Sequence, residues 1–132
     1  MNFDLTEEQK MVQQNVERFV QENYDLSTRI ELTAENPGFG KENWQTMAEL
    51  GWLGLPINES EGGFGGNQID TMIIMEEFGK GLVVEPYLAN VVLSAGVIKR
   101  SNNEKIKNSI LPKIIAGKQQ VSFAYSEVQS RF

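Results

Sequence analysis

The sequence contains neither cysteine nor histidine among its 132 residues. Without cysteine it has no disulfide framework, thiol nucleophile or thiolate metal site. Without histidine, the common zinc sites, Ser-His-Asp triads and histidine-containing di-iron sites are excluded as well. We therefore predict no metal site, and much hydrolytic and metal-dependent catalysis lies outside the chemistry of this chain.

Positive charge and long hydrophobic runs are also scarce. The 12 basic residues stand against 18 acidic ones, for a formal net charge of −6, and no basic stripe offers a phosphate backbone the lysine and arginine cluster it requires. The most apolar stretch, residues 82–98, is interrupted by Glu85 and Pro86 and is shorter than the roughly 20 residues of a membrane span. Residues 1–5 lack the features of a secretory signal. We expect a cytoplasmic protein with no membrane span and no nucleic-acid partner.

The apolar spacing that is present predicts helices over most of the chain. The 40% hydrophobic fraction is typical of one globular domain. Capping boxes at Thr6 and Ser101 mark two helix starts, and Gly51 and Gly117 mark two ends. We predict an all-α fold, an orthogonal or up-and-down bundle of about five to six helices. The expected helices cover residues 6–27, 41–50, 67–82, 86–98 and 101–111, with a short turn from Pro112.

Residues 62–66, which read GGFGG, admit two interpretations. A glycine-rich loop can cradle a phosphate, yet this one has neither the G-x-G-x-x-G nor the G-x-x-x-x-G-K-[ST] pattern. We favour a tight loop in which the chain passes close to its neighbours. For Glu76 and Glu77, the functional alternative is a base that faces the interior. A structural role at a helix or domain junction is favoured, because no partner acid, metal ligand or cationic neighbour is near in sequence. The helix expected within residues 82–98 could line an apolar ligand cavity, and a place in the core is favoured. Trp44 and Trp52 are also expected in the core.

Residues 120–126 alternate in the manner of a β-strand, with Val121, Phe123 and Tyr125 on one side. A lone strand cannot satisfy its backbone groups, and no second β-patterned segment precedes it. We therefore expect a helical domain at residues 1–118 and the start of a truncated β-domain at residues 119–132. Ser122 and Ser126 have no histidine or evident lysine partner, so they are candidate ligand contacts and not nucleophiles.

Six segments of the chain match one family in order and spacing. They are residues 3–9 (FDLTEEQ), 44–56 (WQTMAELGWLGLP), 61–66 (EGGFGG), 75–79 (MEEFG), 111–117 (LPKIIAG) and 123–127 (FAYSE). Together they resemble the amino-terminal region of the flavin-dependent acyl-CoA dehydrogenases. Residues 85–88 and 126–132 look most like the branch typified by the small subunit of pimeloyl-CoA dehydrogenase.

The resemblance implies a parent enzyme with a helical domain, a middle β-domain and a second helical domain, with FAD between the last two. Such an enzyme oxidises an acyl-CoA to the 2,3-enoyl-CoA, passes electrons to electron-transfer flavoprotein or a similar acceptor, and forms homo- or hetero-oligomers. Its catalytic glutamate belongs to the second helical domain. The resemblance therefore implies no catalytic residue in this chain, which we expect to be inactive and free of FAD when alone.

Carried over residue by residue, the resemblance places Phe123, Ala124, Tyr125 and Ser126 against the flavin ring. Ser126 stands where the family usually has threonine, so the hydroxyl is kept. The proline and Gly-Ala-Gly-Ser run that follows in the family is replaced by residues 128–132, which read VQSRF, and in it Arg131 offers a replacement charge for the pyrophosphate.

The resemblance also places Pro86, Tyr87 and Asn90 on the helix that closes the far end of the acyl cavity, where their size and polarity would set chain length or tail polarity. The alternative from another class is a non-catalytic helical interaction module or degenerate subunit. Exposed apolar patches are expected in both cases. A reading frame that continues beyond Phe132 into β-rich and helical segments would favour the dehydrogenase.

Overall fold

The computed structural model describes residues 4–34, 36–126 and 129, and it confirms the all-α prediction. Within those ranges there is no strand. The elements are α1 (Glu7–Asn23), α2 (Leu26–Ala34), α3 (Lys41–Glu49), the 3₁₀ turn η1 (Glu59–Glu61), α4 (Gln68–Lys80), the π-helical η2 (Leu88–Ala95), α5 (Gly96–Arg100) and α6 (Glu104–Ile115).

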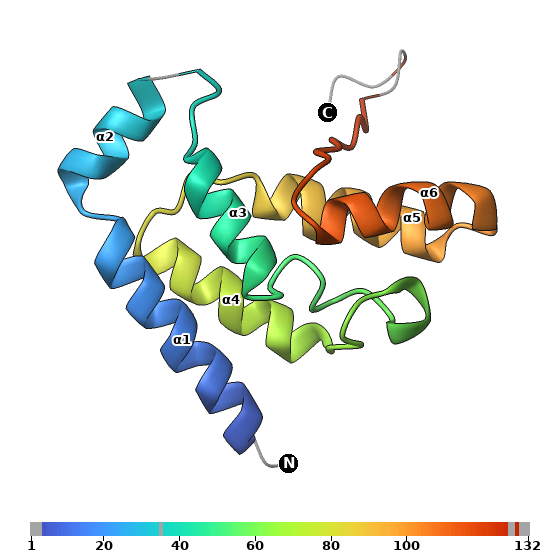
Figure 1. Ribbon diagram of the computed structural model, residues 1–132, viewed down its shortest axis with the longest axis horizontal. Coiled ribbons are helices and arrows are strands. Elements are labelled where there is room, and N and C mark those ends of the chain that lie inside the picture. Colours follow the sequence, from blue (N-terminus) through green and yellow to red (C-terminus); the bar gives the residue numbers. More distant parts are fainter. Residues whose placement is uncertain (1–3, 35, 127–128, 130–132) are drawn as a thin grey trace.

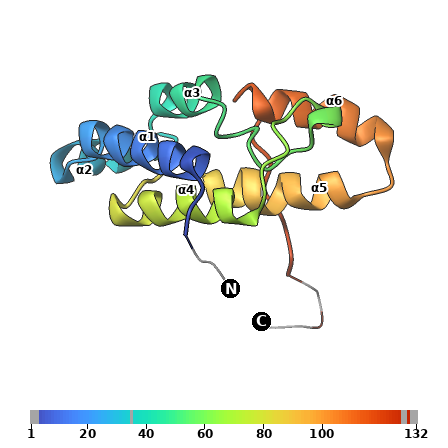
Figure 2. The same cartoon turned by 90° about the horizontal axis from the view of Figure 1, so that it is seen from below.

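The helices form two sides of one bundle. Helices α1 and α4 lie side by side and run in the same direction, with Gln9 paired to Asp70 and Gln13 to Glu77. Helix α4 and the continuous helix η2–α5 line one side of the molecule, and α3 and α6 lie on the opposite side (Figure 2). The chain leaves α6 and crosses η2, so that residues 118–126 emerge beyond the α4–α5 side (Figures 1 and 2).

The structure confirms the predicted start of the first helix and corrects other helix boundaries. Thr6 forms the predicted capping box, with Thr6 Oγ1 accepting from the Gln9 amide at 3.2 Å. The first helix ends at Asn23, however, and a separate helix, α2, follows it that the sequence pattern did not predict. Asp25 causes the break, because its carboxylate accepts from the Thr28 amide at 2.7 Å and competes with the continuing helix. Helix α2 contains no buried residue, so it lacked the apolar stripe that reveals a helix.

Helix α6 also departs from the prediction. Its N-cap is Asn103, whose side chain accepts from the Ile106 amide at 3.1 Å, and not Ser101. The helix continues through Pro112 instead of stopping there. Proline removes one helical hydrogen bond, but Leu111 and Ile114 on either side are fully buried, and their packing keeps the helix intact.

A chain of aromatic rings joins the elements in the core. Phe19 of α1 meets Trp52 edge to face with centroids 5.2 Å apart, Trp52 meets Phe78 of α4 at 6.0 Å, and Phe78 meets Tyr87 at 5.3 Å. The predicted burial of Trp44 and Trp52 is confirmed. Edge-to-face pairs add to the free energy of burial and fix ring orientation, so these contacts set the position of the helix that begins at Leu88.

The glycine segment is a tight loop packed against its own chain. A Cβ atom on Gly63 would lie 2.2 Å from the Ile57 carbonyl oxygen. The amide of Gly65 donates to the same carbonyl at 2.8 Å, and Lys107 pairs with Glu61 at 3.5 Å to tie the loop to α6. These contacts agree with the scaffold interpretation and leave the loop amides engaged within the chain.

Glu77 faces the interior and is 3% exposed. Its carboxylate accepts from Gln13 at 3.1 Å and pairs with Lys80 at 2.8 Å. Lys80, three residues further along the same helix, is thus a cationic neighbour, contrary to the expectation that none lies near in sequence. The carboxylate thus joins α1 to α4, in agreement with the structural interpretation.

A second buried carboxylate joins three loops. Glu85 accepts a short hydrogen bond from the Tyr24 hydroxyl and a bond of 3.1 Å from the Gly40 amide, while Asn43 donates to the Tyr24 oxygen at 3.0 Å. Burial first, and the hydrogen bond to Glu85 second, raise the pKa of Tyr24 well above its usual range. The phenol therefore remains protonated in the folded protein.

Replacing Gly63 by alanine should lower the free energy of unfolding by at least about 2 kcal/mol, because the new methyl group would overlap backbone atoms that cannot move aside. Gly79→Ala is the matched control, since a Cβ atom at Gly79 in α4 meets nothing within 4 Å. That change should stabilise the protein by about 0.5–1 kcal/mol. Urea unfolding measures both, and equal stabilities of the two variants would contradict the packing of this loop.

Tyr24→Phe should weaken the alkaline dependence of stability. The folded state holds the Tyr24 proton above the pKa of about 10 of an unfolded tyrosine, so stability is present below about pH 10 and is lost as pH rises. Between about pH 9 and 11, the free energy of unfolding of the variant should fall by about 1 kcal/mol less than that of the wild type. Tyr125→Phe, at a position 77% exposed, serves as the control. Identical pH profiles for wild type and Tyr24→Phe would contradict the assigned environment.

Candidate functional site

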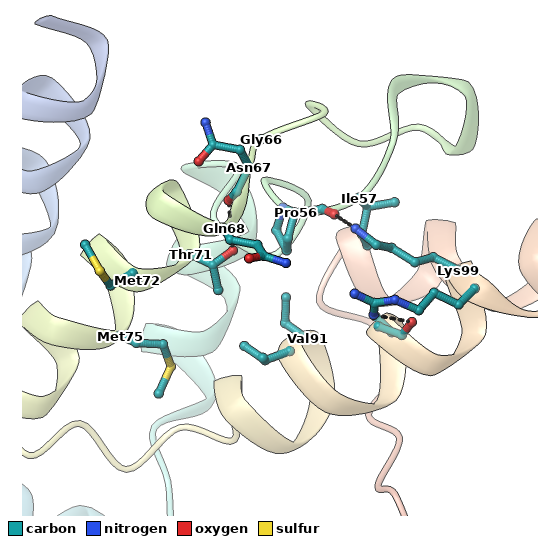
Figure 3. Close-up of a pocket in the computed structure, with 14 residues that line it drawn as sticks. Pro56, Ile57, Gly66, Asn67, Gln68, Thr71, Met72, Met75, Val91 and Lys99 are labelled. Carbon is teal, nitrogen blue, oxygen red and sulfur yellow. Dashed lines mark hydrogen bonds between the residues drawn. The ribbon is translucent and has the colours of Figure 1, made fainter. Parts of the chain in front are cut away.

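A hollow of about 570 Å³ lies between α4 and the helix η2–α5 (Figure 3). This volume lies within the usual range for a small-molecule site. Residues from the loop before α4 close one end, and the two helices form the long walls. The hollow is a feature of tertiary packing, since its walls come from segments more than 15 residues apart in sequence.

The walls of the hollow are apolar and its rim is polar. Figure 3 shows Met72 and Met75 on α4 and Val91 on the neighbouring helix η2, and all three line the hollow. Met72 is 53% exposed, which is a large exposure for an apolar side chain in the middle of a helix. Long, flexible methionine side chains adapt to apolar ligands of varied shape. The hollow is therefore suited to an apolar chain.

Two cations lie at the end of the hollow nearest α5. Lys99 donates to the Pro56 carbonyl, and Arg100 donates to the Gly96 carbonyl at 3.0 Å. Both side chains line the hollow, as do the amides Asn67 and Gln68. None of the described lining residues carries a carboxylate or a phenol, so this wall offers binding and orientation and no base for proton transfer.

The predicted flavin-contact residues lie on the segment that leaves the bundle. Phe123, Ala124, Tyr125 and Ser126 are all exposed. The Phe123 and Tyr125 rings stack with centroids 6.5 Å apart, so side chains two residues apart share one side, as in an extended strand. Residues 118–126 form neither helix nor strand, and their assignment to a β-domain remains a prediction. Arg131, the predicted pyrophosphate contact, lies outside the described residues.

The predicted acyl-cavity residues lie at the start of η2, beside the hollow but not on its surface. Tyr87 is 1% exposed, and its hydroxyl donates to the Trp52 carbonyl at 3.2 Å. Burial raises the pKa of Tyr87 above its usual range, so its hydroxyl remains protonated. Asn90 is equally buried and directs its amide toward residues 119 and 121. With Pro86, these residues shape the helix whose other face lines the hollow, and their effect on an acyl chain stays a prediction.

The sequence pattern does not single out the residues that form the hollow, and it favours a place in the core for the 82–98 helix over a cavity wall. The signal lay in the helix from Gln68 to Lys80, whose apolar residues nearly encircle it although the fold buries one face, so Met72 remains at the surface. Apolar side chains that stay exposed on a helix in this way are typical of a surface that binds a ligand or another protein.

The described ranges lack two further features. No helix there is long and apolar enough to cross a membrane. No group of three or more acidic side chains is gathered there as a metal site would require.

Comparisons with known proteins converge on one family. The model of the acyl-CoA dehydrogenase N-terminal domain matches residues 6–118. The probable acyl-CoA dehydrogenase YngJ of Bacillus subtilis is 33% identical over 129 residues, which cover 96% of this chain and 33% of that protein. The caffeyl-CoA reductase-Etf complex subunit CarC of Acetobacterium woodii is 33% identical over 126 residues, which cover 93% of this chain and 33% of that protein.

Among solved structures, the ChsE4-ChsE5 complex from Mycobacterium tuberculosis has a chain of similar fold. It superposes with a TM-score of 0.88 at 24% identity, covering 98% of this chain and 36% of that one. The chain thus spans about a third of the length of the curated relatives it matches.

Proposed function

The chain belongs to the acyl-CoA dehydrogenase family, and we propose that it is the amino-terminal helical domain of an FAD-dependent enzyme that oxidises an acyl-CoA thioester to the 2,3-enoyl-CoA. The observation that carries the proposal is the arrangement of η2. One face of this helix lines an apolar hollow, and the other holds the segment that leads to residues 123–126. An acyl chain and a flavin are the two groups that such neighbouring surfaces fit.

Phe123 to Ser126 are the residues that would hold the flavin. They are exposed, and the described chain forms no backbone hydrogen bond to them. An extended backbone with unused N–H and C=O groups fits the hydrogen-bonding edge of a planar ring, and the Ser126 hydroxyl adds one more donor. Bound FAD would supply the hydride acceptor. The chain's own contribution is to orient that ring.

The hollow would receive part of the acyl chain. Met75 and Val92 supply the apolar surface. Lys99 and Arg100 at the rim carry positive charge, which is complementary to the phosphate groups of a CoA thioester. Tyr87 and Asn90 lie behind the η2 wall, so any control they exert over acyl length acts through the position of this helix. The base that removes the α-proton would come from another domain, because none of the described residues that line the hollow carries a carboxylate.

Assembly and electron transfer follow from the same family assignment. CarC is a subunit of a reductase-Etf complex, and the ChsE4-ChsE5 structure is a complex of two different chains. We infer that the parent protein forms homo- or hetero-oligomers and passes electrons to electron-transfer flavoprotein or a similar acceptor in the cytoplasm. The exposed apolar side chains Leu88, Leu93 and Val97 on η2–α5 supply surface for packing against further domains.

The first test uses the protein expressed from the complete reading frame. It should purify yellow, release FAD on denaturation, and lose its flavin absorbance when an acyl-CoA is added without oxygen. Ser126→Ala should weaken FAD retention or slow flavin reduction about tenfold, a loss typical of one hydrogen bond to a charged group. Ser109→Ala, which removes an exposed hydroxyl on α6, is the control. A colourless protein, or a flavin that no acyl-CoA reduces, would contradict the proposal.

The second test fills the hollow. Val92→Trp should lower kcat/KM for a long acyl-CoA about tenfold or more and leave a short acyl-CoA less affected, because the added ring occupies apolar volume. Ile106→Trp adds the same ring on α6, at a position 40% exposed and away from the hollow. Equal losses for long and short substrates in Val92→Trp would argue against an acyl chain in this hollow.

A further inference from the structure

We infer that Asn90 and Ser94 are positioning residues for the flavin-facing segment. They hold the backbone of residues 119–121 and so set where residues 123–126 lie. The inference rests on the proposed function, because it takes Phe123 to Ser126 as the flavin contact. It assigns Asn90 a role different from that of lining the acyl cavity.

The Asn90 side chain pairs with the outgoing segment as a neighbouring strand would. Its Oδ1 accepts from the Val121 amide at 2.8 Å, and its Nδ2 lies 3.3 Å from the Gln119 carbonyl oxygen. One side-chain amide thus binds the N–H group of Val121 and the carbonyl group of the residue two positions earlier. In an extended chain these two backbone groups lie on the same edge. In this way the Val121 amide gains a partner although the described residues place no strand beside it.

Ser94 adds a third contact from the next turn of the same helix. Its Oγ lies 3.0 Å from the Val121 carbonyl oxygen and 2.7 Å from the Ala89 carbonyl oxygen five residues earlier, so its one proton can serve either acceptor. The π-helical geometry of η2 brings that second carbonyl into reach. Asn90 and Ser94 are 1% and 3% exposed, and burial of such polar groups is costly unless they are hydrogen-bonded.

The segment is fixed before it reaches η2 as well. The Trp44 indole N–H donates to the Gly117 carbonyl at 3.1 Å. From Val121 to Phe123 the chain advances by two residues, at most about 7 Å. A displacement of Val121 is therefore passed directly to the residues proposed to contact the flavin.

The same helix also places the hollow. Val91, Val92 and Ala95 line it, and they alternate along η2 with the two residues that hold the segment. A single helix thus fixes the distance between the acyl wall and the flavin-facing segment. This explains why two polar side chains occupy buried positions in a helix that is otherwise apolar.

Hydrogen exchange in the 132-residue chain tests the anchor without any flavin. Asn90→Leu should speed exchange of the Val121 amide about tenfold relative to the core amide of Ile74, since the acceptor of that amide is removed. Gln9→Met is the matched control, because it deletes another buried side-chain amide, remote from the segment. Should Asn90→Leu fail to fold, Ser94→Ala serves, with a smaller acceleration of about threefold. An unchanged Val121 to Ile74 ratio in the folded variants would overturn the inference.

The complete flavoprotein tests the consequence. Asn90→Leu should shift the flavin absorbance band and weaken FAD binding about tenfold, while Gln9→Met lowers thermal stability and leaves the spectrum unchanged. An unaltered spectrum and FAD affinity in Asn90→Leu would overturn the positioning role and leave the proposed function intact. A complete protein that binds no FAD would instead remove the proposed function and, with it, the flavin-positioning role, even if the anchor is confirmed.

Discussion

The hydrogen bond from the Val121 amide to the Asn90 side chain is the constraint on which this account depends. A segment patterned as a strand has to satisfy its backbone groups, and the described chain offers it no neighbouring strand. The helix η2 takes that place with two side chains. Because of this bond, the segment leaves the bundle from a fixed position at Val121, and the exposed residues 123–126 start from that position.

The rest of the fold serves to fix that helix. The aromatic contacts from Phe19 through Trp52 and Phe78 end at Tyr87, one residue before η2 begins. Glu85, two residues earlier, is tied to α1 and to the loop before α3. A helix held so firmly at its start can present an apolar wall on one face and polar anchors on another. The wall of the proposed acyl site and the anchors of the proposed flavin-facing segment thus belong to a single element.

Local signals in the sequence predicted the parts of the fold that local interactions determine. The Thr6 capping box and the burial of Trp44 followed from spacing alone. Helix α2 was missed because the Asp25 carboxylate breaks the first helix and no buried stripe marks the second. Pro112 was wrongly assigned as a break, because burial of its neighbours outweighs the lost hydrogen bond. The proposed role of Asn90 was out of reach, since it depends on a backbone 31 residues away. The alternation of residues 120–126 predicted a strand, and these residues form none in the described structure.

The most direct test of the central claim is the structure of the complete protein with FAD bound, in which the distance from the Ser126 Oγ to the flavin ring can be measured. The account predicts a hydrogen-bond distance of about 2.7–3.2 Å, with the Val121 amide still bonded to Asn90. A flavin that lies beyond contact with residues 123–126, or a segment released from η2 in that structure, would contradict it.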